Sequence, residues 1–422
     1  MDVKDGNLDG VSMKILFIHQ NFPAQFKFLA PALVKAGHKV RTLTMRQFKE
    51  STWNGVEIST YSTQRGSSES IHPWIIDFET KVIRGEACFN AAIKLKKTGY
   101  FPDVIVAHPG WGESLFLKEV WPSAKLGLYC EFFYSARGLD VGFDSEFTYP
   151  DLENPCRMSL KNTNNLFHIS QADAGLAPTV WQADTFPWPF RDKITVSHDG
   201  VDTAEVKPDS NVSVTINGNL KLTRDDRVIT YVARNLEPLR GTHIFLRALP
   251  QILSRDPKVR VLIAGSEEIG YGAGPLEGGT WKDVLIAEIK PRLKESELDR
   301  IHFVGQLPYS YFLNLLQLSS VHVYLTYPFV LSWSLLEAMS AGCAIVASAT
   351  GPVMEVISDG HPGRLVNFFD VKALEDQVCS LLDDPEQRRF LGNEARRFII
   401  ENYELTKVCL PKHMAWVEGL PG

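Results

Sequence analysis

The feature that most constrains the fold is a strand–helix–strand pattern that occurs in two separate series along the chain. In the first series, residues 14–19 and 40–44 have the composition of buried strands, and residues 26–36 between them have helical spacing. A second series begins with the apolar run at residues 228–233. Strands joined through helices lie parallel in one sheet, and ligands collect at the carboxyl ends of such strands. The pattern predicts an α/β protein with two Rossmann-like domains facing each other across a cleft.

Chain length is consistent with two domains, because 422 residues exceed what one hydrophobic core usually supports. We expect an N-terminal Rossmann-like domain over residues 13–203 and a C-terminal Rossmann-like domain over residues 204–395. The polar stretch at residues 208–226 has few large apolar residues, which is typical of a linker. The linker near residues 199–226, which contains this stretch, is predicted to act as the hinge between the domains.

Composition excludes several classes of protein. A net charge of −6 argues against a nucleic-acid surface, which requires clustered lysine and arginine. The six cysteines are scattered without metal-ligand spacing, and no apolar run reaches the ~18 residues of a membrane helix. The chain is therefore expected to be cytoplasmic. A small basic cluster (Lys94, Lys96 and Lys97) leaves open a peripheral contact at the inner membrane face, although a solvated surface is the simpler interpretation.

Three ligand-binding motifs are missing from the sequence, and each absence argues against one class of enzyme or site. The first strand is not followed by G-x-G-x-x-G, which argues against a nicotinamide enzyme. The chain has no Walker lysine motif, which argues against a P-loop NTPase. It also has no Asp-x-Asp, the commonest sequence sign of a sugar nucleotide held by a metal. We therefore predict neither a metal nor a cofactor.

Two segments of the second domain predict a phosphate-binding edge. Arg234 and Arg240 follow its first strand, beside a helix that begins at Gly241. Guanidinium groups and helix amide groups at such a position bind a diphosphate. Farther on, Ser332 or Ser334 is placed to cap a helix, and Glu337 lies in that helix near enough to its start to reach a ribose. The alternatives are solvated arginines and an ordinary surface helix.

The first domain offers a histidine and an aromatic, acidic loop. His108 follows the strand at residues 103–107 and precedes two glycines, so it is a site candidate, although most single histidines are structural. The loop at residues 136–155 suits sugar hydroxyl groups or a dimer contact. Its aromatic and acidic members are Asp140, Phe143, Asp144, Glu146, Phe147 and Tyr149.

Together these segments resemble glycosyltransferase family 4, retaining enzymes of the GT-B fold, over nearly the whole chain from Lys14. Residues 233–241 (ARNLEPLRG) are similar to the family's arginine and Lys-Gly, with Arg240 in place of the lysine and one extra residue between. Residues 334–342 (SLLEAMSAG) resemble the helix whose glutamate binds the donor's ribose. Residues 198–202 and 351–357 resemble the domain junction and the segment after the helix.

The resemblance implies transfer of a glycosyl group from a UDP- or GDP-sugar to an acceptor hydroxyl, with retention of configuration. The acceptor would be a carbohydrate, a lipid-linked sugar or a small molecule. In this scheme His108 faces the donor sugar and Glu337 binds the ribose. Arg234 and Arg240 stabilise the leaving phosphate. The remaining residues expected to bind the donor are Asn21, Ser332 and Trp333, and those expected to bind the acceptor are Glu131, Tyr134 and Asp140. The resemblance makes residues 13–203 the acceptor domain and residues 204–395 the nucleotide-sugar domain. A helix within residues 396–422 is expected to cross back to the first domain.

One position departs from the family pattern. The first glutamate of the usual Glu-x7-Glu would fall at residue 329, where this chain has Phe329. The contact to the donor sugar must then come from elsewhere, such as Ser332 or the backbone near it. Two alternatives follow: a same-fold epimerase or phosphorylase, and a glycosyltransferase-like binding protein without catalysis.

Overall fold

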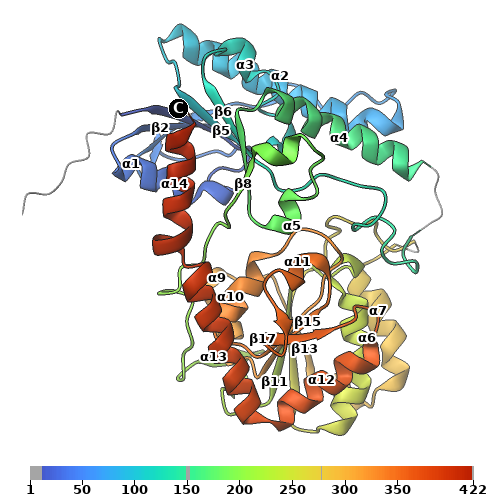
Figure 1. The fold of residues 1–422 in the computed structure, drawn as a ribbon. Coiled ribbons are helices and arrows are strands. Elements are labelled where there is room, and N and C mark those ends of the chain that lie inside the picture. Colours follow the sequence, from blue (N-terminus) through green and yellow to red (C-terminus); the bar gives the residue numbers. More distant parts are fainter. Residues whose placement is uncertain (1–11, 149–152, 277, 421–422) are drawn as a thin grey trace, which may run out of the picture. The chain divides into compact units, whose positions relative to one another are not determined.

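The computed structural model describes residues 12–148, 153–276 and 278–420 (Figure 1). The chain divides into two compact units, each built on its own sheet. Unit 1 contains Met1–Tyr134, Asp151–Asp199 and Cys409–Gly422, and unit 2 contains Ser135–Pro150 and Gly200–Val408.

Unit 1 is built on an eight-stranded sheet with the strand order β3-β4-β2-β1-β5-β6-β7-β8. Neighbouring strands pair in parallel, except β3 with β4 at one edge. The strands are β1 (Lys14–Ile18), β2 (Lys39–Thr44), β3 (Thr52–Trp53), β4 (Val56–Thr60), β5 (Val104–Ala107), β6 (Lys125–Tyr129), β7 (Ala174–Ala177) and β8 (Ile194–Val196). The parallel order places the ends of β1, β5 and β6 side by side.

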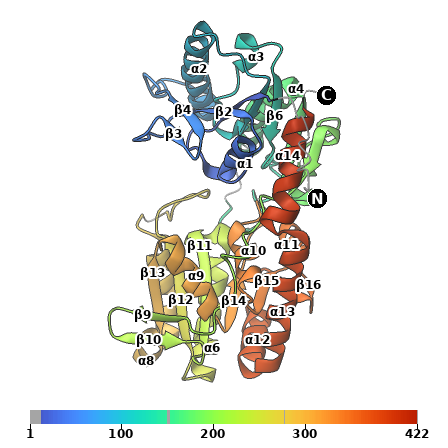
Figure 2. The same ribbon diagram turned by 90° about the vertical axis from the view of Figure 1, so that its left-hand side faces the viewer.

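Successive residues of β1 enter different cores, which explains why the strand is apolar throughout. Leu16 and Ile18 are buried in a cluster shared with α2 (Ile76–Lys97), α3 (Leu117–Val120) and α4 (Asn154–Gln171). Ile15 and Phe17 are buried in a second cluster with α1 (Leu29–Lys35) and α14 (Leu410–Gly419). These helices surround the sheet of unit 1 in Figure 2. A strand covered on both faces needs no polar alternation.

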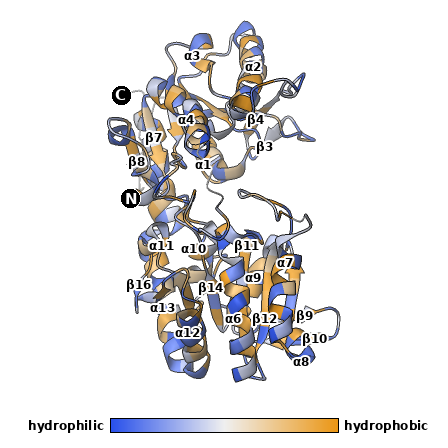
Figure 3. Ribbon diagram, turned by 90° about the vertical axis from the view of Figure 1, so that its right-hand side faces the viewer, coloured by the Kyte–Doolittle hydropathy of each residue, from blue (hydrophilic) through white to orange (hydrophobic). Residues whose placement is uncertain are grey.

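Unit 2 contains a seven-stranded sheet of order β13-β12-β11-β14-β15-β17-β16, in which neighbours pair in parallel. The strands are β11 (Val228–Asn235), β12 (Arg260–Ser266), β13 (Ile301–Gly305), β14 (Val321–Tyr324), β15 (Ile345–Ser348), β16 (Ser358–Asp359) and β17 (Pro362–Val366). The main helices are α6 (Thr242–Arg255), α7 (Trp281–Ile289), α9 (Tyr309–Leu318), α10 (Trp333–Ser340), α12 (Val371–Asp383) and α13 (Pro385–Asn402). Figure 3 shows hydrophilic and hydrophobic residues alternating along α12, as expected of a helix with one buried face.

Short helical segments complete the two units. They are α5 (Val180–Ala183), α8 (Glu295–Leu298), α11 (Gly351–Met354), the 3-10 turns Ala24–Phe26, Pro73–Ile75, Pro109–Trp111, Phe190–Lys193, Pro238–Arg240 and Lys290–Arg292, and the π-helix Leu405–Cys409.

The predicted linker is wrong over residues 213–223. Residues 213–223 form a hairpin of β9 (Ser213–Ile216) and β10 (Leu220–Thr223) instead of an open hinge. Val212, Ile216 and Leu222 are buried in the main core of unit 2. Alternation of small apolar residues with polar ones made this stretch look like a linker, although one face of the hairpin is buried.

The boundaries of the units also differ from the predicted domains. The division falls after Asp199 instead of after residue 203, and residues 135–150 belong to unit 2. The predicted C-terminal element is divided as well, because α13 continues to Asn402 within unit 2 and only Cys409–Gly422 joins unit 1. There, Gly127 of β6 permits α14 to pack closely, since an added Cβ would lie 2.5 Å from the Trp416 ring. No helix within the described ranges has the length and hydropathy required to span a membrane.

Candidate functional site

Arg240 is fixed between two loops at the carboxyl edge of the unit 2 sheet. It ends the turn that follows β11, and its Nη1 donates to Thr326 Oγ1 at 3.1 Å and to the Val330 carbonyl at 3.3 Å. Both acceptors lie in the β14–α10 loop, which runs from β14 to the start of α10. The guanidinium group therefore ties this loop to the first turn after β11. Arg234, near the end of β11, is exposed, and no hydrogen bond joins its side chain to the described residues.

Gly241 allows this close approach. Its φ of +73° is unfavourable for other residues, and an added Cβ would lie only 2.4 Å from Leu325 Cβ. Gly241 also stands at the N-cap position of α6, so the amide groups of that helix begin directly beside Arg240. A helix start next to a fixed arginine suits an anionic group.

The start of α10 lies in the same part of unit 2. As predicted, Ser332 is the cap: its Oγ accepts a hydrogen bond from Ser334 N at 3.3 Å. The Ser332 amide donates to Tyr324 Oη at 3.0 Å, so β14 fixes the entry to the helix. Trp333 is the first residue of α10 and is half-buried. The carboxylate of Glu337, in the same helix, accepts a hydrogen bond from Tyr309 Oη at 2.8 Å.

A buried carboxylate holds the glycine-rich loop after β12. Glu237 is only 2% exposed, and its oxygens accept hydrogen bonds from the amide groups of Gly270, Tyr271 and Gly272 at 3.3–3.4 Å. An added Cβ at Gly270 would lie 2.7 Å from Glu237 Oε1, so a larger residue there would displace this carboxylate.

Phe329, the residue that departs from the family pattern, packs against Tyr271 and Arg240. It is 3% exposed, its ring centroid lies 5.0 Å from that of Tyr271, and the Arg240 guanidinium lies 5.7 Å from it. The aromatic ring thus connects the glycine-rich loop to Arg240. A cation over an aromatic face is attractive, which helps to hold the arginine in place.

In unit 1, His108 lies among polar and aromatic groups at the carboxyl edge of the sheet. It is 3% exposed, its Nδ1 accepts a hydrogen bond from Gly110 N at 3.1 Å, and its Nε2 lies 3.5 Å from Glu131 Oε2. The ring packs against Trp111 at 4.6 Å between centroids. The structure therefore brings together His108 and Glu131, which the sequence placed on separate strands.

His19 was missed, although it obeys the rule that identified His108. It follows β1 directly, its Nε2 lies 3.0 Å from Gln25 Oε1, and its ring centroid lies 5.5 Å from that of His108. Burial, followed by the nearby His108, lowers the pKa of His19 to about 3, so its ring is neutral at physiological pH. Parallel strand order brings the ends of β1 and β5 together, and that adjacency could have been inferred.

The other predicted site residues lie in both units. Asn21 lies in the turn after β1, and its backbone amide donates to His19 Nδ1 at 3.0 Å. Tyr134 ends the first segment of unit 1, with Lys161 Nζ 3.8 Å from its ring centroid. Asp140 is assigned to unit 2, whereas Glu131 and Tyr134 are assigned to unit 1.

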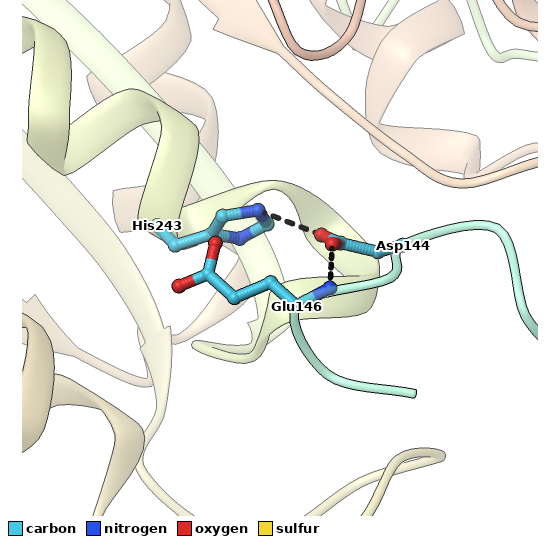
Figure 4. A group of neighbouring side chains, drawn as sticks. All are labelled: Asp144, Glu146 and His243. Carbon is cyan, nitrogen blue, oxygen red and sulfur yellow. Dashed lines mark hydrogen bonds and ion pairs between the residues drawn. The ribbon is translucent and has the colours of Figure 1, made fainter. Parts of the chain in front are cut away.

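One group of three described side chains has the spacing of a cation site: Asp144, Glu146 and His243 (Figure 4). Their side-chain atoms already contact one another or a neighbouring arginine, however. The Asp144 carboxylate lies 3.0 Å from His243 Nε2, and both Glu146 oxygens accept hydrogen bonds from Arg247. Because an arginine occupies both oxygens of one carboxylate, the group is better described as an ion-pair network.

Comparison with known proteins agrees with the resemblance noted in the sequence. Residues 36–206 match the profile described as the glycosyl transferase family 4 group, and residues 215–398 match the profile of glycosyl transferases group 1. The chain belongs to glycosyltransferase family 4.

Curated relatives of this family 4 chain match only part of it. A D-inositol 3-phosphate glycosyltransferase of Corynebacterium efficiens is 25% identical over 244 residues, which cover 57% of this chain and 53% of that protein. A phosphatidyl-myo-inositol mannosyltransferase of Mycolicibacterium smegmatis is 29% identical over 172 residues, covering 39% and 38%. The matches with the first of these relatives thus span about half of its length.

Solved structures match nearly the whole chain. A sucrose-phosphate synthase of Thermosynechococcus elongatus has a TM-score of 0.70 at 19% identity and covers 96% of this chain and 98% of that one. HepE of Anabaena in complex with UDP-glucose has a TM-score of 0.63 at 14% identity, covering 95% and 98%. These similarities confirm the predicted GT-B fold with its two Rossmann-like domains.

Proposed function

We propose that this chain transfers a glycosyl group from a nucleoside diphosphate sugar to an acceptor hydroxyl, with the anomeric configuration retained. The observation that carries the proposal is Arg240, held by Thr326 and Val330 directly beside the start of α6. A fixed guanidinium and helix amide groups suit a diphosphate, which is the leaving group in such a transfer.

Charge develops on the β-phosphate as the glycosyl bond breaks. Arg240 would stabilise this charge without rearrangement, because its hydrogen bonds already hold it in place. Arg234 would add a second guanidinium from the end of β11. Glu337 would accept hydrogen bonds from the ribose hydroxyls, and Ser332 and Trp333 would contribute at the start of α10. No metal and no organic cofactor is required in this scheme.

The donor class is supported by HepE, whose structure contains UDP-glucose, and a UDP- or GDP-sugar is proposed accordingly. Phe329 replaces the carboxylate expected near the donor sugar, so backbone groups near Ser332 are proposed to bind that sugar. In unit 1, His108 is proposed to orient the sugar, with Asn21 nearby in the turn after β1.

The acceptor is proposed to be a polyol, a carbohydrate or a lipid-linked sugar, bound by Glu131 and Tyr134. Polyol acceptors are tested first, because two of the relatives are named for inositol-containing substrates. An epimerase or a non-catalytic binding protein is not favoured, because the named relatives are glycosyltransferases.

The test is release of nucleoside diphosphate from a panel of UDP- and GDP-sugars, with and without inositol phosphates, simple sugars and lipid-linked sugars. One donor and one acceptor should together give release well above either alone, and NMR of the product should show the donor's anomeric configuration. Release that needs no acceptor, or a product of inverted configuration, would contradict the proposal. Co-sedimentation with anionic vesicles at low salt tests the separate expectation of a peripheral membrane contact.

A further inference from the structure

A segment from the first half of the sequence is built into unit 2. The chain leaves unit 1 after Tyr134, and residues 135–150 belong to unit 2 although the flanking elements β6 and α4 belong to unit 1. We call the described part of this segment, residues 135–148, the docking strap. Four of its side chains contact other parts of unit 2: Phe143, Asp144, Glu146 and Phe147. Tyr149 lies outside the described residues.

Aromatic and ionic contacts hold the docking strap on unit 2. Phe143 packs against Tyr327 at 5.0 Å and Phe368 at 5.3 Å between centroids, and Phe147 packs on His243 at 4.9 Å. The Glu146 carboxylate accepts two hydrogen bonds from Arg247, a bidentate pair that fixes the strap along α6.

Asp144 is the most buried carboxylate of the docking strap, at 3% exposed. Its Oδ2 accepts a hydrogen bond from Tyr327 Oη at 2.8 Å and lies 3.0 Å from His243 Nε2, while its Oδ1 accepts from Glu146 N at 3.0 Å (Figure 4). Burial acts to raise the pKa of Asp144, but the hydrogen bonds from His243, Tyr327 and the Glu146 amide outweigh it, so the pKa lies below its ordinary value. The side chain is therefore charged at neutral pH.

The two partners of Asp144 belong to the two segments that adjoin Arg240. Tyr327 belongs to the β14–α10 loop, between Thr326 and Val330, the two residues to which Arg240 donates. The Tyr327 amide donates to the Leu239 carbonyl at 2.9 Å, so the loop and the turn before Arg240 are already joined. His243 is the second residue of α6, three positions after Arg240. The Asp144 carboxylate thus contacts both the β14–α10 loop and the first turn of α6, the two segments next to the Arg240 guanidinium group.

We propose that Asp144 is a positioning residue for the donor site. By holding Tyr327 and the first turn of α6, it fixes the position of the Arg240 guanidinium group. This inference rests on the proposed function for its effect on donor binding. It also has a consequence that is independent of any donor, because loss of the Tyr327 contact loosens the β14–α10 loop itself.

The experiment compares Asp144→Ala and Tyr327→Phe with Glu146→Gln in the full chain. Tyr327→Phe removes one hydroxyl and keeps the ring in its aromatic cluster, so it also serves if Asp144→Ala does not fold. Glu146→Gln is the matched control, because it weakens the docking strap on α6 without touching Tyr327. Two quantities are measured: affinity for the nucleotide sugar that the wild type binds best, and hydrogen exchange of the Phe329 and Ser332 amides, which donate to Tyr327 O and Tyr324 Oη.

Asp144→Ala and Tyr327→Phe should each weaken donor binding by about tenfold or more, the effect of losing a hydrogen bond to a charged group. The double variant should be no weaker than Asp144→Ala alone, since both changes remove the same contact. Both should speed amide exchange in the loop, whereas Glu146→Gln should leave affinity and exchange within about twofold of the wild type. If donor binding is what changes, each variant should raise the KM for the donor more than it lowers kcat.

Equal effects of Glu146→Gln and Tyr327→Phe would overturn the proposal, because simple anchoring of the strap would then explain both. Unchanged exchange and affinity in Tyr327→Phe would also overturn it. If the loop exchanges faster as expected while the wild type binds no nucleotide sugar, the positioning role stands and the proposed function fails.

Discussion

Glu113 provides a stability test that can be worked out from its surroundings. It is fully buried in unit 1, beyond the turn that follows His108, and neither of its carboxylate oxygens has a hydrogen-bond partner among the described residues. Burial raises the pKa of Glu113 from its ordinary 4.5 to about 7. A buried carboxylate without partners should be protonated in the folded protein over much of the physiological range.

The sign and size of the effect follow from linkage. An acid with a raised folded pKa binds its proton more tightly in the folded state, so stability is greatest below pH 4.5 and falls as pH rises towards 7. The difference of about 2.5 pH units, at 1.36 kcal/mol each, costs about 3 kcal/mol of unfolding free energy above pH 7. Glu113→Gln keeps the shape of the side chain and removes the ionisation.

Urea denaturation of wild type and Glu113→Gln at pH 5, 6, 7 and 8 measures this effect. The variant should be within about 1 kcal/mol of wild type at pH 5 and more stable by about 3 kcal/mol at pH 8. Glu119→Gln is the control, because Glu119 is exposed in the same region and should not change the slope. If the unfolding free energies of wild type and Glu113→Gln fall by the same amount between pH 5 and pH 8, the reasoning is refuted.

Two further substitutions test the structure around Arg240. Gly241→Ala should lower the unfolding free energy by more than about 2 kcal/mol, through positive φ and a close Cβ contact, measured by urea denaturation. Gly218→Ala has the same φ of +73° but open space, and it should cost less; equal losses would show that the close contact is unimportant. Glu237→Gln should weaken the three amide hydrogen bonds of the glycine-rich loop and speed its cleavage in limited proteolysis, whereas Glu268→Gln, on the exposed loop, should not. Unchanged cleavage in Glu237→Gln would contradict the assigned role.

Much of the fold could be predicted because buried parallel strands leave a strong local signal. Strands such as β1 and β11 are apolar on both faces, and the helices between them keep a clear period. The edge strand β3, its neighbour β4 and the hairpin at residues 213–223 were missed, since each has few apolar residues and packs on a core formed by distant parts of the chain. Local pattern cannot show which surface such an element covers.

The candidate site could also be predicted only in part. The positions of Arg240, Ser332 and His108 could be predicted because each residue follows a strand or begins a helix, and sequence spacing shows such positions directly. The contact of Tyr327 with Asp144 joins residues 183 positions apart, and no local rule connects them. The docking strap therefore looked like a free binding loop in the sequence.

The central claim, that unit 2 binds the diphosphate of a sugar nucleotide through Arg240, is tested most directly by titration calorimetry. Wild type, Arg240→Ala and the exposed control Arg292→Ala are titrated with UDP, GDP and the corresponding sugars. The account predicts that wild type and Arg292→Ala bind one nucleotide series, and that Arg240→Ala binds it at least about tenfold more weakly, as expected for a lost charge-assisted contact. Equal affinity of Arg240→Ala and wild type, or no binding of any nucleotide by the wild type, would contradict it.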